Sequence, residues 1–477
     1  MKAPFSEYLT GIAEGLKKLT AVLDQEFDYV SILASDTKGL NIRVSGRSKS
    51  VSNETVQTER GIVVRTARDG YYSEYATNLF DPRNIQSLAE QIRKSFEEQN
   101  QIMKAAGVKP YETPVLNDEP LTLFVEMETE QLPETADVQS IVGRLTEITE
   151  RESEKREEIR DCILSCRSNH VSKMFLTKNR DLRQSYVFSE ASAYTLAARG
   201  DRSEAWHEGA SGRCGPELFE KISECAAKAS DSAVSLLDAE RIVPGEYEII
   251  TTPEVSGLIA HEAFGHGVEM DMFVKNRALG KEYIGKRVGS DLVTMHEGAL
   301  CAEEVSSYAF DDEGILAGDV TEIENGILRT GICDALSALR LGTVPTGNGK
   351  RENYSHKVYT RMTNTIFDSG ESTAEEMIAS VKKGYLLVGM QSGMEDPKHW
   401  GIQCIISSGH EIIDGKLTGK IVSPVIMTGY VPDLLGNVSM VSGDREVFGC
   451  GMCGKGYKEW VKVSDGGPYL KTKARLG

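Results

Sequence analysis

The chain has 477 residues, of which 40% are hydrophobic and 26% charged, enough apolar material for a globular protein of two or three domains. Asp and Glu number 72 against 54 Lys and Arg, a net charge of −18, so a nucleic-acid backbone or an anionic membrane surface would be repelled. The sequence also lacks a run of about 18 apolar residues that could cross a membrane. We therefore expect neither a membrane nor nucleic acid as a direct partner.

The first hundred residues predict a helix, two hairpins and a second helix. Residues 29–44 and 61–75 are rich in β-branched and aromatic residues, with turn signals at residues 36–39 and at Asp69-Gly70. The second helix begins near Ile85, with Asp81-Pro82 as a cap and a first-turn proline. The N-terminal helix is indicated by apolar residues at helical spacing, which differ from the solid apolar core of a secretory signal: Phe5, Leu9, Ile12, Leu16 and Leu19.

The middle of the chain continues with helices and extended segments. Three prolines with Asn117-Asp118 between them predict a break between subdomains at 108–120. Residues 137–161 predict a charged helix with a solvated face. Residues 171–197 predict extended structure, and residues 216–238 another helix.

Beyond residue 240 the chain changes to short extended segments separated by glycine-rich turns. Helices are predicted there only around 253–266 and 373–382. The fold class is therefore α+β. We expect an N-terminal α/β-hairpin domain over residues 1–240 and a β-rich C-terminal domain with few helices over residues 241–477.

The segment His261-Glu262-Ala263-Phe264-Gly265-His266 is the strongest candidate for chemistry. Neutral imidazoles bind Zn²⁺, and a carboxylate beside them can take a proton from metal-activated water. Thr252 can cap the helix that carries this segment, and Pro253 suits its first turn. A hydrolytic zinc centre is the predicted use of these residues.

The spacing of the two histidines requires an unusual backbone. Side chains five residues apart point about 140° apart around a regular α-helix, whereas the four-residue spacing of common zinc peptidases gives about 40°. His261 and His266 could face one ion after a π-type widening, or after unwinding beyond Phe264, which Gly265 and Gly267 permit. We predict a local helical irregularity at 261–267.

A catalytic zinc takes three protein ligands, so one more must come from elsewhere. From the residues alone, the third ligand could be Glu269, Asp271, another histidine or a thiolate. Cys450 and Cys453 form a Cys-x-x-Cys pair that could supply one ligand, supply two and close a structural Cys₂His₂ centre, act as a redox dithiol, or be unreactive. Because the nine cysteines are odd in number and sparse, we expect reduced thiols and a cytoplasmic protein.

Two polar, positively charged stretches, residues 345–351 and 361–365, stand out in an acidic chain. They could bind a substrate carboxylate or backbone, with Arg361 and Asn364 as the contacts, or they could form turns and a strand. The sequence does not separate these two interpretations.

Four motifs in this order resemble the TldD branch of the TldD/PmbA (TldE) zinc metallopeptidases, also known as modulators of DNA gyrase. The C-terminal half carries the motifs, and the N-terminal half is similar in its general layout. The motifs are His261-Glu262-Ala263-Phe264-Gly265-His266, Pro345-Thr346-Gly347-Asn348-Gly349, Arg361-Met362-Thr363-Asn364 and Cys453-Gly454-Lys455.

The resemblance implies a zinc-dependent peptidase of the His-Glu-x-x-x-His type, with one Zn²⁺ per chain. Its ligands would be His261, His266 and Cys453, and Glu262 would be the general base on zinc-bound water; Cys450 has no counterpart in the family pattern. The resemblance also implies a cytoplasmic homodimer, or a heterodimer with a metal-free TldE/PmbA-like paralogue, whose cavity admits unfolded or extended peptides. The alternative is a non-catalytic scaffold or binding protein with a structural Cys₂His₂ zinc.

Overall fold

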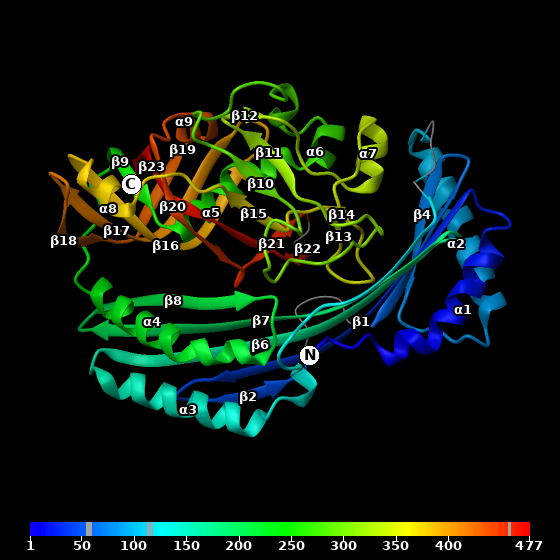
Figure 1. Ribbon diagram of the computed structural model, residues 1–477, viewed down its shortest axis with the longest axis horizontal. Helices are drawn as coiled ribbons and strands as arrows, with labels where there is room; N and C mark the ends of the chain where they lie inside the picture. The colour runs from blue at the N-terminus through cyan, green and yellow to red at the C-terminus, as the bar shows by residue number, and fades with distance from the viewer. Residues whose placement is uncertain (54–59, 112–115, 117, 457–458) are drawn as a thin grey trace.

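The computed structural model describes residues 1–53, 60–111, 116, 118–456 and 459–477. Its described residues form two large β-sheets, each covered by helices, and two small two-stranded sheets (Figure 1). The sheet from the first half of the chain extends along the lower side of the molecule and up at the right, and the second half lies above it (Figure 1). This confirms the α+β class with a β-rich C-terminal region and few long helices. No helix in these ranges is long and apolar enough to cross a membrane.

The N-terminal sheet has eight strands in the order β4-β3-β1-β6-β7-β5, with β2 paired to β1 and β8 to β7. Neighbouring strands are antiparallel except β5, which runs parallel to β7. The strands are β1 (Tyr29–Val44), β2 (Lys49–Ser52), β3 (Gly61–Arg68), β4 (Tyr71–Thr77), β5 (Leu121–Glu126), β6 (Ile159–Leu176), β7 (Arg180–Arg199) and β8 (Arg202–Gly212).

Four helices cover this sheet in two pairs. Helices α1 (Glu7–Leu23) and α2 (Ile85–Ala105) bury their apolar faces at the end formed by β1, β3 and β4. At the other end, α3 (Val138–Lys155) and α4 (Ile222–Leu236) pack on β6, β7 and β8 (Figure 1). Short 3₁₀ turns occur at η1 (Pro133–Thr135) and η2 (Pro216–Lys221).

Several of the predicted N-terminal elements are confirmed. The N-terminal helix forms as α1, and Asp69 and Gly70 take positive φ angles of 53° and 75° in the β3–β4 turn. The charged helix forms as α3, capped by the Asp137 carboxylate on the amide of Ser140. The extended segment at 171–197 lies in the β6–β7 hairpin, and the helix predicted at 216–238 forms as η2 followed by α4.

Two details of the N-terminal prediction were wrong. No turn interrupts residues 36–39, because β1 continues through them and pairs with β6 from Ile32 to Val44. Asp81 does not cap α2, since its carboxylate binds the side chain and amide of Arg83, and the helix begins after Asn84. The subdomain break predicted at 108–120 lies partly outside the described residues, at 112–115 and 117.

The C-terminal sheet has eleven strands in the order β12-β11-β10-β15-β23-β19-β17-β16-β9, with β18 on β17 and β20 on β23. Strand β23 also pairs with β9, so β23, β19, β17, β16 and β9 close into a ring. The strands are β9 (Gly245–Thr251), β10 (Met295–Glu297), β11 (Val320–Glu324), β12 (Ile327–Leu328), β15 (Asn364–Phe367), β16 (Lys383–Asp396), β17 (Gly401–Ile413), β18 (Lys416–Val422), β19 (Val425–Tyr430), β20 (Met440–Phe448) and β23 (Ser464–Leu476).

Two small hairpins and several short helices complete the C-terminal half. The hairpins are β13–β14 (Gly349–Lys350 and Tyr359–Thr360) and β21–β22 (Met452–Lys455 and Glu459–Lys462). The helices are α5 (Pro253–Leu258), α6 (Met270–Val274), η5 (Leu279–Glu282), α7 (Ala335–Leu341), α8 (Ala374–Ala379) and α9 (Val431–Gly436). Of these, α5 and α8 fall where helices were predicted.

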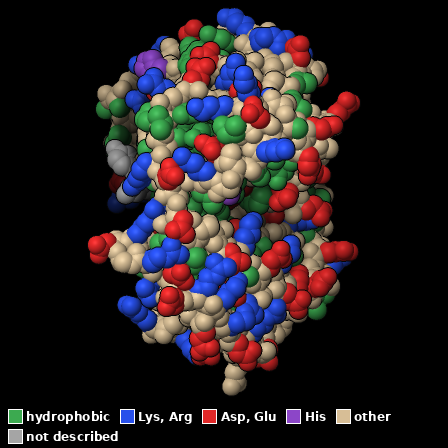
Figure 2. Space-filling view, turned by 90° about the vertical axis from the view of Figure 1, so that its left-hand side faces the viewer, with side chains coloured by type: hydrophobic (Ala, Val, Ile, Leu, Met, Phe, Trp, Pro, Cys, Tyr) green, Lys and Arg blue, Asp and Glu red, His purple; other side chains and the backbone are tan. Residues whose placement is uncertain are grey.

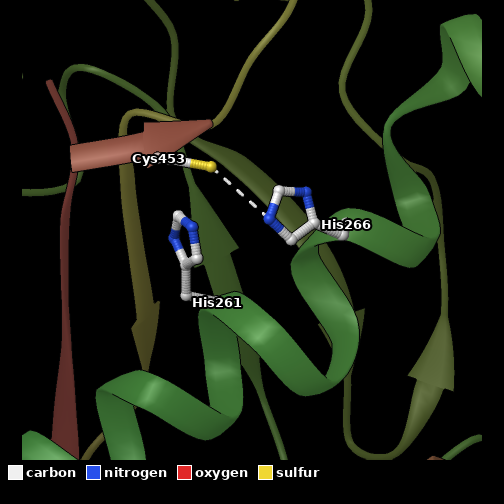
Figure 3. Close-up of side chains that lie close together, drawn as sticks. All are labelled: His261, His266 and Cys453. Carbon is white, nitrogen blue, oxygen red and sulfur yellow. Dashed lines mark hydrogen bonds between the residues drawn. The ribbon is translucent and has the colours of Figure 1, made fainter. Parts of the chain in front are cut away.

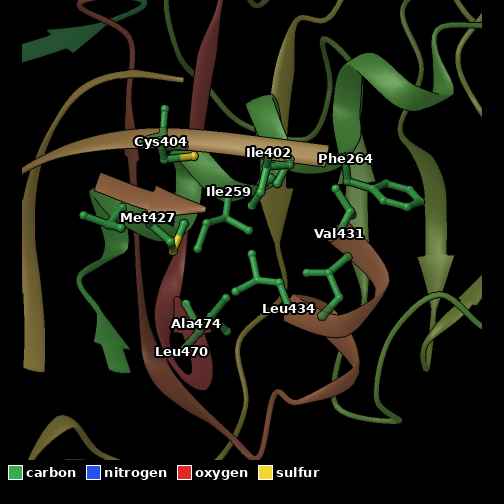
Figure 4. Packing of buried hydrophobic residues seen from close by; sticks show 14 of the residues in the cluster. Ile259, Phe264, Ile402, Cys404, Met427, Val431, Leu434, Leu470 and Ala474 are labelled. Carbon is green, nitrogen blue, oxygen red and sulfur yellow. The ribbon is translucent and has the colours of Figure 1, made fainter. Parts of the chain in front are cut away.

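The core of the C-terminal half surrounds α5 and the helical turns that follow it. Ile259 and Phe264 belong to one buried cluster with Ile402, Met427 and Leu470, which come from three different strands (Figure 4). Ile259, Phe264 and Met427 are at most 1% exposed. The segment that contains the two candidate histidines is therefore held by the sheet.

Buried ion pairs join the N-terminal sheet to residues 311–313 of the C-terminal half. The Lys173 ammonium lies 2.5 Å from Asp312, and Arg65 lies 2.5 Å from Glu313. Burial alone would lower the pKa of Lys173, but Asp312 raises it above its usual value. Lys173 thus depends on a partner from the other half of the chain, whereas Arg65 also pairs with Glu74 of its own half.

Removing one partner should therefore be costly. We predict that Asp312→Ala lowers the free energy of unfolding by about 3 kcal/mol, because it leaves the Lys173 charge buried and unpaired. The matched control is Asp291→Ala, which breaks a pair with Arg287 in which Asp291 is 81% exposed and should cost less than about 1 kcal/mol. Denaturant unfolding measures both, and equal losses would contradict the prediction.

Candidate metal centre

The backbone around the histidines departs from α-helical geometry. After α5, residues Ile259–Phe264 form a π-helix (η3) and Gly265–Val268 a 3₁₀ turn (η4). The predicted irregularity at 261–267 is confirmed. The wider turn brings His261 and His266 together, with ring centroids 5.2 Å apart and planes at 84°.

Local sequence explains how the chain tolerates this geometry. A Cβ atom on Gly265 would lie 2.3 Å from the sulfur of Met362, so a larger residue there would have to displace the methionine side chain. Pro253 occupies the first turn of α5, as predicted. Thr252 is the N-cap residue, but its hydroxyl makes no capping hydrogen bond, so that part of the prediction was wrong.

The third member of the cluster comes from the β21–β22 hairpin. Cys453 Sγ lies 3.4 Å from Nε2 of His266, and the candidate ligand atoms of Cys453, His261 and His266 all lie within 4.8 Å of one another (Figure 3). His261 is 3% and Cys453 5% exposed. Two segments almost two hundred residues apart in sequence thus meet in a largely buried site.

The chemistry of these groups fits a zinc ion. Two imidazoles and a thiol are typical zinc ligands, and Nδ1 of His261 is buried without a hydrogen-bond partner among the described residues. Burial opposes a charged sulfur, yet His266 and His261 lower the pKa of Cys453 well below its usual value. The site therefore favours the thiolate, the form that binds metals.

Glu262 lies beside the cluster. Its Oε2 is 3.9 Å from Nε2 of His266, and its side chain is 21% exposed. Strand β16 passes close over it, since a Cβ atom on Gly393 would lie 2.5 Å from Cγ of Glu262. The carboxylate is thus confined next to the histidines without being sealed from the cleft.

The cluster opens into a cleft of about 700 Å³, whose walls include Glu262, Met390 and Trp460. A second cleft of about 1040 Å³ also contacts Met390, together with Gln391 and Gly451, which line both clefts. The two clefts therefore lie next to each other along β16. On the face drawn in Figure 2, acidic and basic side chains are interspersed over both halves.

Two further carboxyl groups, those of Asp465 and Glu395, line the cleft beside the three candidate ligands, and no sequence motif indicated them. Burial raises the pKa of Asp465 to about 7, and burial raises the pKa of Glu395 well above its usual value. Neither residue belongs to a motif, since β23 and β16 bring them to the site only in the folded protein. No signal in the sequence distinguished them from other acids.

Comparison with known proteins gives the family. Residues 244–474 match the model of the PmbA/TldA metallopeptidase C-terminal domain. The C-terminal half belongs to the TldD/PmbA family. The resemblance drawn from the four motifs is therefore confirmed.

Relatives named as metalloproteases match more than half of the chain. The chain is 34% identical over 268 residues to a metalloprotease of Methanocaldococcus jannaschii, covering 55% of this chain and 58% of the relative. It is 31% identical to a "Metalloprotease TldD homolog" of Buchnera aphidicola subsp. Acyrthosiphon pisum, covering 53% and 52%. A "Zinc metalloprotease TldD homolog" of Saccharolobus solfataricus is 29% identical, covering 63% and 67%. The chain thus spans little more than half the length of the first two.

Solved structures share the fold over nearly the whole chain. TldE from Thermococcus kodakarensis superposes with a TM-score of 0.76 at 18% identity, covering 97% of this chain and all of that one. A putative modulator of a DNA gyrase from Thermotoga maritima also gives a TM-score of 0.76 at 18% identity, covering 98% of this chain. The N-terminal half therefore has the architecture of this fold as well.

Two TldD/PmbA motif residues need a corrected role. We expected Arg361 and Asn364 to be candidate substrate contacts, but they are 1% and 0% exposed. The Arg361 guanidinium donates to the carbonyls of Cys453 and Glu459, and the Asn364 amide donates to the carbonyl of Gly298. Both side chains are used within the protein, where Arg361 fastens the hairpin that carries Cys453.

In the structure the other candidates for the third zinc ligand are engaged elsewhere. Cys450 points away from the cluster and donates to the carbonyl of Ala210 at 3.5 Å. Burial raises the pKa of its thiol. Glu269 contacts Nδ1 of His266, on the side of the ring opposite Cys453, and Asp271 pairs with lysines. Within the described ranges, only Cys453 joins the two histidines in a potential metal cluster.

The two thiols of the Cys-x-x-Cys pair should therefore react differently. We predict that iodoacetamide modifies Cys453 of the metal-free protein faster than Cys450 at neutral pH, because the thiolate is the nucleophile. Peptide mapping by mass spectrometry measures both rates, with Cys453→Ser as the control for site assignment. A faster reaction at Cys450 would contradict the assigned difference in thiol pKa.

Proposed function

We propose that the chain is a zinc-dependent peptidase with one Zn²⁺ held by His261, His266 and Cys453. The observation that carries this proposal is the convergence of these three side chains beside Glu262 at the wall of a cleft. A zinc ion bound there would polarise water and the scissile carbonyl of a peptide. The metalloprotease names of the relatives support the same reaction.

Glu262 is the proposed general base. Its partly exposed carboxylate lies against the His266 ring and faces the cleft, so it can accept a proton from water and later give it to the leaving amine. His261, His266 and Cys453 hold their positions because the π-turn and the hairpin are packed into the core. Metal binding and proton transfer are thus assigned to different side chains.

The proposed substrates are unfolded or extended peptides. Two neighbouring clefts of about 700 and 1040 Å³ give room for several residues of an extended chain. We propose that these clefts face an enclosed cavity in a homodimer, or in a heterodimer with a metal-free TldE/PmbA-like chain, as the fold shared with TldE supports. Direct nucleic-acid binding is not part of the proposal, given the net charge of −18.

Location and domain division complete the proposal. All nine cysteines are free thiols in the structure, which fits a reducing, cytoplasmic setting. We propose a first domain over residues 1–240 and a metallopeptidase domain over residues 241–477. The change from one sheet to the other, between Gly212 and Gly245, supports this division.

Glu262→Gln tests the proposed base. The variant should bind zinc as the wild type does but lose at least about 100-fold in peptide hydrolysis, because the amide cannot accept the proton. Zinc content and cleavage of an unfolded peptide, with and without a chelator, measure both properties. Wild-type cleavage by Glu262→Gln would exclude Glu262 as the base, while zinc in both proteins with no cleavage by either would indicate a missing partner chain or a structural metal.

Cys450→Ala separates the peptidase from a scaffold with a structural Cys₂His₂ zinc. Because the Cys450 thiol bonds to Ala210 and not to the cluster, the variant should keep its zinc, its melting temperature and its activity. Cys453→Ala is the matched variant and should lose zinc. Zinc loss with unfolding in Cys450→Ala would instead favour the structural site, since structural zinc contributes directly to folding.

A further inference from the structure

The protein itself holds one side of the His266 ring. Nδ1 of His266 lies 3.1 Å from Oε2 of Glu269, while Nε2 faces Cys453 Sγ at 3.4 Å. A neutral imidazole carries one N–H, and a carboxylate at Nδ1 keeps the proton there, which leaves the lone pair of Nε2 on the side of the thiol. Glu269 is 2% exposed, so water is largely excluded from this contact.

The Glu269 carboxylate needs nearby cations to remain charged at this depth. Nζ of Lys455 lies 3.1 Å from Oε2 of Glu269, and Nε of Arg361 lies 3.9 Å from Oε1. The carboxylate thus lies between the His266 ring on one side and two cationic side chains on the other.

Lys455 is itself fixed in position. Besides Glu269, its ammonium donates to Oδ1 of Asp271 at 2.7 Å and to the carbonyl of Thr360 at 3.0 Å. Two hydrogen bonds and the ion pair with Glu269 hold the ammonium group. With its side chain 11% exposed, Lys455 has little freedom to move.

Lys455 follows Cys453 by two residues on β21, so the two side chains lie on the same face of that strand. The strand therefore brings the cluster sulfur and the cation that holds Glu269 to the site together. Any shift of β21 that moved Cys453 would also disturb the contact between Lys455 and Glu269. The two halves of the cluster are coupled through His266, Glu269 and Lys455.

We propose that Glu269 is the positioning residue of His266, and that Lys455 acts on the metal through Glu269. The inference rests on the zinc centre proposed above. Neither residue belongs to the cluster of candidate metal ligands. Their effect is to fix the ring of His266 relative to Cys453 before the metal arrives, and thereby to raise the affinity of the site for zinc.

The zinc dissociation constant, measured by competition with a fluorescent chelator, tests this inference. Glu269→Ala and Lys455→Met should each weaken zinc binding about 10–100-fold, as loss of groups that orient a ligand does. The double variant should be no weaker than Glu269→Ala, because the lysine acts through the carboxylate. Glu269→Gln keeps an oxygen that can accept the hydrogen bond from Nδ1 of His266, and this variant should bind zinc more tightly than Glu269→Ala.

Lys275→Met is the matched control. Lys275 pairs with Oδ2 of Asp271 at 3.0 Å and its side chain is 44% exposed, and it contacts neither Glu269 nor the cluster. Its loss should leave the zinc dissociation constant unchanged. Melting temperatures of the metal-free proteins show whether any variant loses zinc merely because it unfolds.

Wild-type zinc affinity in Lys455→Met would overturn the role of the lysine, and independent, multiplying losses in the double variant would overturn its action through Glu269. If Lys455→Met fails to fold, the glutamate variants decide, because wild-type affinity in both Glu269→Ala and Glu269→Gln refutes the positioning role. Failure of the proposed zinc centre is distinguishable from all these results, since the wild type itself would then bind no zinc.

Discussion

The five-residue spacing of His261 and His266 is the constraint on which the rest of the site depends. A regular α-helix would direct the two imidazoles apart, and the π-helix that unites them is rarely stable by itself. The distortion persists because Ile259 and Phe264 are buried against the closed ring of strands. Gly265 gives the space that Met362 occupies. Packing against the β-rich half thus keeps the π-helical turn in place.

A second requirement is to hold a sulfur from a distant hairpin against that turn. Arg361 holds the hairpin in place, because its guanidinium donates hydrogen bonds to the carbonyls of Cys453 and Glu459, one on each strand of the hairpin. Glu269 and Lys455 connect the hairpin to the His266 side. Arg361, from one of the positively charged stretches of this acidic sequence, therefore acts within the buried part of the site.

The parts of the structure that could be predicted from the sequence are those decided by neighbouring residues. The irregular turn at 261–267 follows from helical arithmetic, and the Asp69-Gly70 turn from the preference of these residues for positive φ. The continuity of β1 through residues 36–39 could not be predicted, since it depends on pairing with β6 more than a hundred residues away. The same holds for the burial of Arg361 and for the placement of Glu395 and Asp465, which only the tertiary fold determines.

The ring of strands also sets the order in which the protein can be built. Its closing strand, β23, lies beside β9, so that Leu476 pairs with Gly245 across almost the entire C-terminal half. Such long-range pairings form late, because the loop entropy must be overcome before the contact is gained. A ribosome-bound chain that has not yet released residues 464–476 cannot complete the support of the π-turn. The zinc site proposed above would therefore be complete only after β23 has paired with β9 and β19.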